Sequence, residues 1–278
     1  MPLLPSGLQL PDLRVVAGEA VLLHEDADER RVASLALRLQ ADGIVRNPPI
    51  VAALDDERFV VLDGANRVSA LRRLGLPDLL VQVVDYDQVT LTTWYHLVTG
   101  TPTADFAQGL ADIPGLHLEP AGLDDARRRL AAGDCVAFVV QPQGDVTCLS
   151  GGESLVERTT LLQAVVRLYK GRANIHRVQS DEIGGHVPYY TEITGLVVFP
   201  AYRPADILAM ARLEAKLPSG ITRHLIPLRA LRVNTELELL WSDTLRSEKN
   251  RWLAEWTRHK LQERQIRFYE EPTVLYDE

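Results

Sequence analysis

The residues best suited to chemistry lie in one short stretch, Asp63-Gly64-Ala65-Asn66-Arg67, which follows an apolar run and opens a helical pattern. A strand ending at Asp63 and a helix starting after Gly64 would aim unpaired backbone N–H groups and the positive end of the helix dipole at one spot. Such a spot binds anions, above all phosphate. Gly64 permits close approach of a ligand, and Arg67 offers a bidentate contact to phosphate oxygens. The stretch predicts a phosphate-binding loop, although an ordinary β-to-α turn with Asn66 as its N-cap also fits.

The elements around this loop follow from hydrophobic spacing. Asp26 and Glu29 have the spacing of a capping box, and the helix that follows them is predicted to end at Gly43. Two apolar runs at 49–53 and 58–62, separated by an acidic turn, predict a hairpin whose second strand enters the loop. The first hundred residues are therefore expected to form a compact α/β unit.

The remaining chain predicts a second α/β unit. Apolar runs at 136–140 and 146–149 suggest a hairpin, and the pattern of 155–169 is that of a helix. We also expect a helix over 91–98 and one long polar helix over 238–263. A domain boundary near residue 100 follows from this division.

Composition narrows the class of protein. The chain has 278 residues, of which 46% are apolar, and a formal net charge of −8. Because acids are interleaved with the arginines, nucleic acid is not an expected partner. Cys135 and Cys148 are expected to be core residues and not zinc ligands. No signal peptide or membrane helix is expected, which makes the cytoplasm the predicted compartment.

The loop carries a family resemblance. The pattern Gly64-x-x-Arg67-x-x-Ala70, placed after a strand and preceded by Asn-Pro-Pro-Ile-Val at 47–51, resembles the nucleotide-handling motif of the ParB/sulfiredoxin superfamily. Sulfiredoxins carry a reactive cysteine in this loop, where this chain has no thiol nucleophile. ParB proteins bind CTP and add a helix-turn-helix and a basic surface, and neither is visible here after residue 85.

The free-serine kinases of this superfamily resemble the chain most widely. Glu25 precedes the first helix where that family has an essential carboxylate, and Trp94 lies where it has a substrate-contacting tryptophan. Thr222-Arg223-His224 resembles its C-terminal motif, whose histidine lines the amino-acid pocket.

The resemblance implies an α/β (α+β) fold with two domains. Residues 1–100 would form a ParB/sulfiredoxin-like nucleotide-binding domain, and residues 101–278 a C-terminal domain that completes the substrate pocket across a cleft. The implied activity is transfer of a phosphate from ATP or ADP, with Mg²⁺, to L-serine.

The resemblance also implies roles for single residues. Glu25 would accept the hydroxyl proton, and Asp63 would bind Mg²⁺, orient Arg67 or assist the base. Residues 63–67 would hold the nucleotide phosphates. The amino acid would lie among Trp94, Thr222, Arg223 and His224. No dedicated metal ligands are visible.

One departure leaves alternatives open. The family's loop commonly has two histidines, where this chain has Ala65 and Asn66. The donor, which is ATP, ADP or CTP, is therefore open, as are the acceptor and the oligomeric state. A ParB-like nucleotide-binding regulator, associated with DNA or not, and a paralogue that binds its ligands without turnover are the two rival hypotheses.

Overall fold

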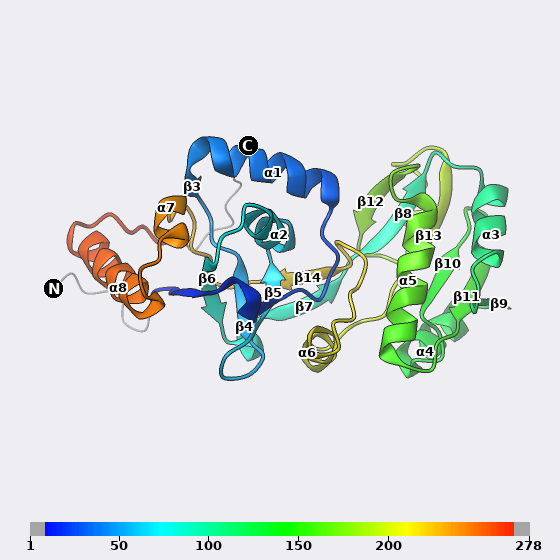
Figure 1. Ribbon diagram of the computed structural model, residues 1–278. Helices are drawn as coiled ribbons and strands as arrows, with labels where there is room; N and C mark the ends of the chain where they lie inside the picture. Colours follow the sequence, from blue (N-terminus) through cyan, green and yellow to red (C-terminus); the bar gives the residue numbers. More distant parts are fainter. Residues whose placement is uncertain (1–8, 270–278) are drawn as a thin grey trace.

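The computed structural model describes residues 9–269 and has the expected mixture of helices and sheets. Two sheets lie side by side along an elongated molecule (Figure 1). The first has the strand order β1-β6-β4-β5-β2, and the second the order β12-β8-β13-β10-β11-β9. The first sheet mixes parallel and antiparallel pairs, while every pairing in the second is antiparallel.

The elements have the following bounds. The first sheet contains β1 (Asp12–Ala17), β2 (Val21–Leu22), β4 (Ile50–Ala53), β5 (Phe59–Asp63) and β6 (Asp78–Val84). The second contains β8 (Tyr95–Thr99), β9 (His117–Ala121), β10 (Ala137–Val140), β11 (Val146–Ser150), β12 (Asn174–Val178) and β13 (Ile193–Val198). Two small ribbons pair β3 (Ile44–Val45) with β15 (Thr235–Glu236) and β7 (Thr90–Thr93) with β14 (Thr222–Leu225). The helices are α1 (Glu29–Asp42), α2 (Ala65–Arg73), α3 (Thr103–Ala111), α4 (Leu123–Ala132), α5 (Leu155–Tyr169), α6 (Pro204–Arg212), α7 (Leu237–Trp241) and α8 (Arg246–Gln262).

The start of α1 differs from the sequence prediction. Asp28, and not Asp26, is the N-cap, and its Oδ1 accepts hydrogen bonds from the backbone N–H groups of Arg30 and Arg31. Asp26 is held elsewhere, because its N–H donates to the Leu217 carbonyl at 2.8 Å. The predicted end is confirmed, since Gly43 closes the helix with φ 68°.

Two predicted helices are wrong. Residues 91–98 form the strands β7 and β8, where threonines favour the extended backbone and long-range pairing outweighs the helical spacing. The predicted helix over 238–263 is divided into α7 and α8 by Ser242-Asp243-Thr244, whose side chains compete with helical hydrogen bonds. The Ser242 hydroxyl donates to the Leu239 carbonyl at 2.9 Å.

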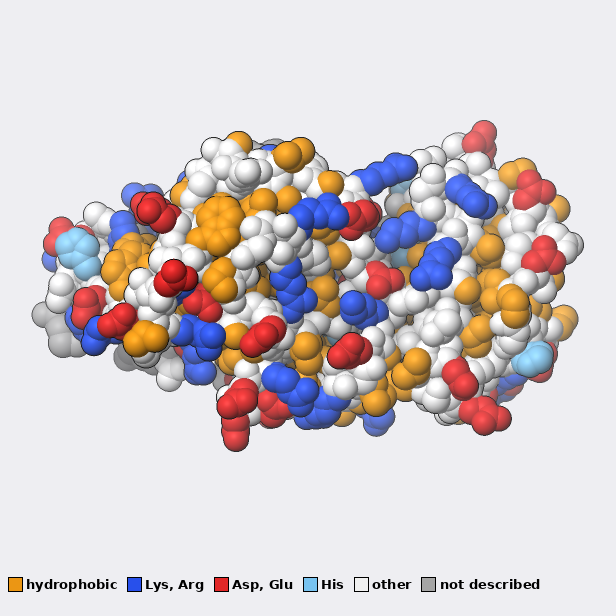
Figure 2. Space-filling model, in the orientation of Figure 1, with side chains coloured by type: hydrophobic (Ala, Val, Ile, Leu, Met, Phe, Trp, Pro, Cys, Tyr) orange, Lys and Arg blue, Asp and Glu red, His pale blue; other side chains and the backbone are white. Residues whose placement is uncertain are grey.

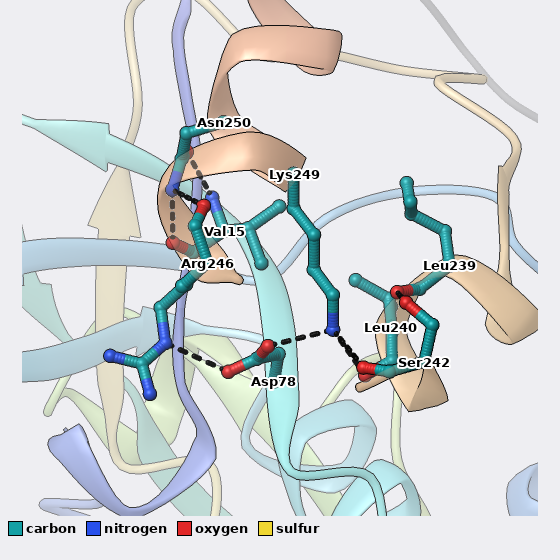
Figure 3. A network of polar contacts seen from close by, with 8 residues as sticks. All are labelled: Val15, Asp78, Leu239, Leu240, Ser242, Arg246, Lys249 and Asn250. Atoms are coloured by element: carbon teal, nitrogen blue, oxygen red, sulfur yellow. Dashed lines mark hydrogen bonds and ion pairs between the residues drawn. The ribbon is translucent and has the colours of Figure 1, made fainter. Parts of the chain in front are cut away.

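The C-terminal segment returns to the first sheet. Val233, Leu237, Leu240 and Leu253 are buried with the residues of that sheet in one apolar cluster. Beside them, the fully buried ammonium of Lys249 reaches Asp78 on β6 at 2.8 Å (Figure 3). In sequence these residues lie inside the second predicted domain, but they pack against the first sheet.

A membrane-spanning helix is absent from residues 9–269, since no helix there combines the necessary length and apolar character.

Candidate active site

The segment before α1 is tied to the segment before β14. The Asp26 N–H donates to the Leu217 carbonyl, and the Leu217 N–H donates to the His24 carbonyl, both at 2.8 Å. These two bonds form an isolated parallel bridge that places Glu25 beside residues 217–222. Residues almost two hundred positions apart therefore form one wall.

Glu25 is held by three donors. Its Oε2 accepts from the Gly220 N–H at 2.8 Å, and its Oε1 accepts from the Thr222 N–H at 2.7 Å and from the Thr222 hydroxyl. The side chain is 12% exposed. Since each carboxylate oxygen has two lone pairs, Oε1 is filled, whereas Oε2 keeps one for a further donor. Oε2 therefore has room for one more hydrogen-bond donor from the cleft.

The predicted loop opens α2, with Gly64 as N-cap and Ala65 as the first helical residue. The helix therefore presents unpaired N–H groups at this point, as an anion site requires. Arg67 Nη1 donates to the Pro48 carbonyl at 3.3 Å, which holds its guanidinium across the loop. The Asn66 side-chain oxygen accepts from the Asp28 N–H at 2.8 Å, so it joins the starts of α1 and α2.

Gly64 is required by both conformation and space. Its φ is 97°, and a Cβ there would lie 2.9 Å from Arg67 Nη1 and 3.2 Å from Pro49 Cα. We expect Gly64→Ala to cost about 1–3 kcal/mol of stability and to weaken nucleotide binding about tenfold, because the backbone must shift away from Pro49. Calorimetric titration with nucleotide and thermal unfolding measure the two effects.

Gly75→Ala is the matched control. Gly75 has φ 77° with nothing within 4 Å of a built Cβ, so it has the same backbone constraint without the crowding. It should lose stability and retain nucleotide affinity. Equal nucleotide affinities for the two variants would contradict the assignment of the loop.

Asp63 ends β5 beside the loop and forms an ion pair with Arg229, with Nη1 and Oδ2 2.6 Å apart. Both side chains are more than a third exposed, so the pair contributes little to stability. Its effect is to fix the orientation of the Asp63 carboxylate at the mouth of the loop.

A buried group of rings lies behind Glu25. The His24 and His224 rings meet edge to face with centroids 5.5 Å apart, and Tyr86 Oη lies 2.8 Å from His224 Nε2. His24 Nδ1 donates to the Val61 carbonyl at 2.7 Å, and its Nε2 lies 2.9 Å from the Thr222 hydroxyl. Burial lowers the pKa of His24, and burial together with the His24 ring lowers the pKa of His224 to about 3.

Acid should destabilise the protein through these buried histidines. Burial also lowers the pKa of His96 to about 4 from its ordinary value of 6.5. Between these values the unfolded chain binds more protons than the folded one. The free energy of unfolding should therefore fall as pH falls from about 6.5 to 4, by about 1.4 kcal/mol per pH unit for each histidine.

Urea unfolding at pH 7, 6 and 5 measures this slope. His96→Gln should reduce this slope by the contribution of one histidine. His117 is exposed, so His117→Gln is the control and should leave the slope unchanged. A slope that is unchanged in His96→Gln would contradict the assignment.

Because side chains alternate along a strand, the predicted substrate residues of β14 lie on its two opposite faces. Thr222 and His224 lie on the side of β14 that faces Glu25 and Tyr86. Arg223 leaves the opposite side, where its guanidinium carbon lies 4.5 Å from the centre of the Trp94 ring. The backbone N–H of Trp94 donates to the Ile221 carbonyl at 2.8 Å, which ties Trp94 to the residue just before β14.

One large cleft, of about 1610 Å³, is lined by Glu25, by the loop that opens α2 and by the β14 residues Thr222, Arg223 and His224. Its described lining has eight Lys or Arg and four Asp or Glu, in a chain whose formal net charge is −8. Figure 2 shows Lys and Arg side chains gathered where the two halves of the molecule meet. The structure brings together all ten predicted residues here: Glu25, Asp63, Gly64, Ala65, Asn66, Arg67, Trp94, Thr222, Arg223 and His224.

The sequence did not predict four other residues of the site: His24, Tyr86, Arg177 and Arg229. Tyr86 is not among the cleft-lining residues and reaches the site only through His224, while the other three line the cleft. His24 directly precedes Glu25 in the chain, so its neighbour was a signal for it, whereas Tyr86, Arg177 and Arg229 lie outside any motif and are identified only by the fold. Among the described residues, no group of three or more His, Cys, Asp or Glu side chains is arranged to hold a metal ion.

The curated proteins that resemble this chain share one name, ATP-dependent L-serine kinase. No protein-family model matches the chain. It is 24% identical to the ATP-dependent L-serine kinase SbnI of Staphylococcus aureus, over 86% of this chain and 88% of that protein. It is 29% identical to an ATP-dependent L-serine kinase of Staphylothermus marinus, over 80% of this chain and 88% of that protein.

The solved structures that resemble this chain include free serine kinases and SbnI. A free serine kinase in complex with AMP superposes with a TM-score of 0.71 at 18% identity, covering 84% of this chain and 95% of that chain. The chain has the fold of the free serine kinases. SbnI with a C-terminal truncation gives a TM-score of 0.67 at 21% identity, covering 90% of this chain and 96% of that one.

Proposed function

We propose that this protein is a nucleotide-dependent kinase of free L-serine, which forms O-phospho-L-serine. One observation carries the proposal: Glu25 Oε2, with a lone pair available, shares a basic cleft with the N-terminal loop of α2. The named activity of the curated relatives, ATP-dependent L-serine kinase, supports the same reaction and favours ATP as donor.

The reaction assigns each group a task. The serine hydroxyl oxygen attacks the terminal phosphorus of the nucleotide, and the bond from that phosphorus to the bridging oxygen breaks with its electron pair on the leaving nucleotide. The hydroxyl proton passes to Glu25 Oε2. The N–H groups at the start of α2 and the Arg67 guanidinium stabilise the phosphate charge.

The amino acid occupies the side of the cleft near β14. Trp94, Thr222, Arg223 and His224 line this pocket in the proposal. The Thr222 hydroxyl also donates to Glu25, so replacement of this side chain affects the base as well as the substrate. Neutral His224 offers a hydrogen bond without adding charge.

We propose that residues 1–100, apart from β8, form a ParB/sulfiredoxin-like nucleotide-binding domain, and that residues 101–278 complete the cleft in a cytoplasmic enzyme, with Val233, Leu237, Leu240 and Leu253 packed against the first sheet. The order of helix, hairpin and loop at the start of the chain supports the first assignment.

Mg²⁺ fits this site only together with the nucleotide. The described residues form no cage of their own, and Mg²⁺ in kinases is held chiefly by substrate phosphates and one or two carboxylates. Bound in this way, it would neutralise phosphate charge.

The decisive experiment incubates the protein with L-serine and Mg²⁺, separately with ATP, ADP and CTP, and detects O-phosphoserine by mass spectrometry. Product with one nucleotide establishes the activity and names the donor. Nucleotide binding without product from any donor overturns the kinase proposal. Salt-dependent DNA binding in that case would favour the nucleotide-binding regulator.

A further inference from the structure

Gly220 is the meeting point of the site's two halves. Its N–H donates to Glu25 Oε2 at 2.8 Å, and its backbone lies beside buried His96 on β8. Its φ is 81°, and a Cβ there would overlap Nη2 of Arg177 and lie 2.6 Å from Cζ. The Arg177 guanidinium therefore lies directly against the residue that positions the catalytic carboxylate.

Arg177 is placed for a ligand and not for an internal partner. It lies on β12, the edge strand of the second sheet nearest to α1 (Figure 1), and lines the cleft. Within residues 9–269 its side chain makes no hydrogen bond and no ion pair. A guanidinium without such a partner, in a cleft built for anionic ligands, is a receptor for a carboxylate or a phosphate.

Three other guanidinium groups of the cleft lie elsewhere, and the Lys170 ammonium donates to the Ser219 hydroxyl at 2.9 Å. Arg223 leaves the opposite face of β14 and stacks on Trp94. Arg67 lies at the phosphate loop, with its guanidinium on the Pro48 carbonyl, and Arg229 pairs with Asp63. These positions leave Arg177 as the guanidinium adjoining Gly220.

We propose that Arg177 binds the α-carboxylate of the amino-acid substrate. The inference rests on the proposed function, because it assumes that the substrate hydroxyl lies at Glu25 Oε2. In serine only two carbons separate the hydroxyl oxygen from the carboxylate carbon. A hydroxyl at Glu25 therefore puts the carboxylate within reach of a group that touches Gly220, and the planar guanidinium binds a carboxylate in a bidentate manner. Arg177 thus selects amino acids over simple alcohols.

The test compares L-serine with L-serinamide, which keeps the size of serine and lacks the negative charge. Arg177→Gln should raise KM for L-serine about 10- to 100-fold, the loss expected for a hydrogen bond to a charged group. Its KM for L-serinamide and for the nucleotide should stay unchanged, and Arg177→Lys should fall between. Arg172→Gln is the matched control, because Arg172 is exposed and outside the cleft lining.

Other outcomes overturn the inference. An equal loss with both acceptors would make Arg177 structural, and a raised KM for the nucleotide would make it a phosphate ligand. If the wild-type protein forms no phosphoserine, the proposed function fails, and calorimetric titration with L-serine then decides on Arg177 separately. Equal affinities of the wild type and Arg177→Gln for L-serine would reject the carboxylate-binding role of Arg177. The absence of L-serine binding by the wild type would also reject it.

Discussion

Glu25→Gln should lower kcat for phosphoserine formation by about 10²- to 10⁴-fold, the usual contribution of a general base. Glutamine keeps the length of the side chain and one acceptor oxygen, which can serve the Thr222 donors. Its NH2 group then faces the Gly220 N–H and cannot take the hydroxyl proton. Because the phosphate loop is formed by other residues, KM for the nucleotide should change little. Steady-state kinetics with both substrates varied will separate the two parameters.

Glu19→Gln is the control for this prediction, since Glu19 is exposed on the same part of the chain and outside the cleft lining. Its kcat should equal that of the wild type. A Glu25→Gln protein with unchanged kcat would show that the proton leaves by another route, for example directly to a phosphate oxygen. A raised nucleotide KM with unchanged kcat would make Glu25 a binding residue.

Local patterns predicted most of the elements that surround the site. The predicted hairpin at 49–53 and 58–62 is β4 and β5, and the helix predicted over 155–169 has those bounds in the structure. The loop at 63–67 also follows from sequence, because a strand, a glycine and a helix are adjacent in the chain. Each of these features is determined by neighbouring residues, which is the information that periodicity contains.

The parts that the sequence did not predict depend on distant partners. Residues 91–98 are extended because β7 pairs with β14, some 130 positions later, and because β8 lies between β12 and β13. Asp63 meets Arg229 across a separation of 166 residues, and Glu25 meets Gly220 across 195. No local pattern records such pairings, so the geometry of the base and the place of Arg177 emerged only from the fold.

Lys249 also depends on contacts with distant residues. Its side chain is fully buried, and its Nζ donates to Asp78 Oδ2 and to the Ser242 carbonyl at 2.8 Å, and to the Leu240 carbonyl at 3.2 Å (Figure 3). Lys249→Met should lower the free energy of unfolding by about 3–5 kcal/mol. Two carbonyls lose their donor, and the buried Asp78 carboxylate keeps only the half-exposed Arg246 as a cation. Guanidinium unfolding monitored by tryptophan fluorescence measures the loss.

Two further variants separate the buried pair from its surroundings. Arg246 is the second partner of Asp78, and its own side chain is 51% exposed. Arg246→Gln should therefore lower the free energy of unfolding by about 1 kcal/mol or less. Combining Lys249→Met with Asp78→Leu removes both buried charges and should recover part of the stability lost in Lys249→Met. A double variant as unstable as the sum of the single ones would mean that packing of the lysine stem, and not its charge, attaches α8 to the first sheet.

Asn250 makes the adjacent attachment, since its amide pairs with both the N–H and the carbonyl of Val15 on β1, and it should hold α8 in place when the charge pair is removed.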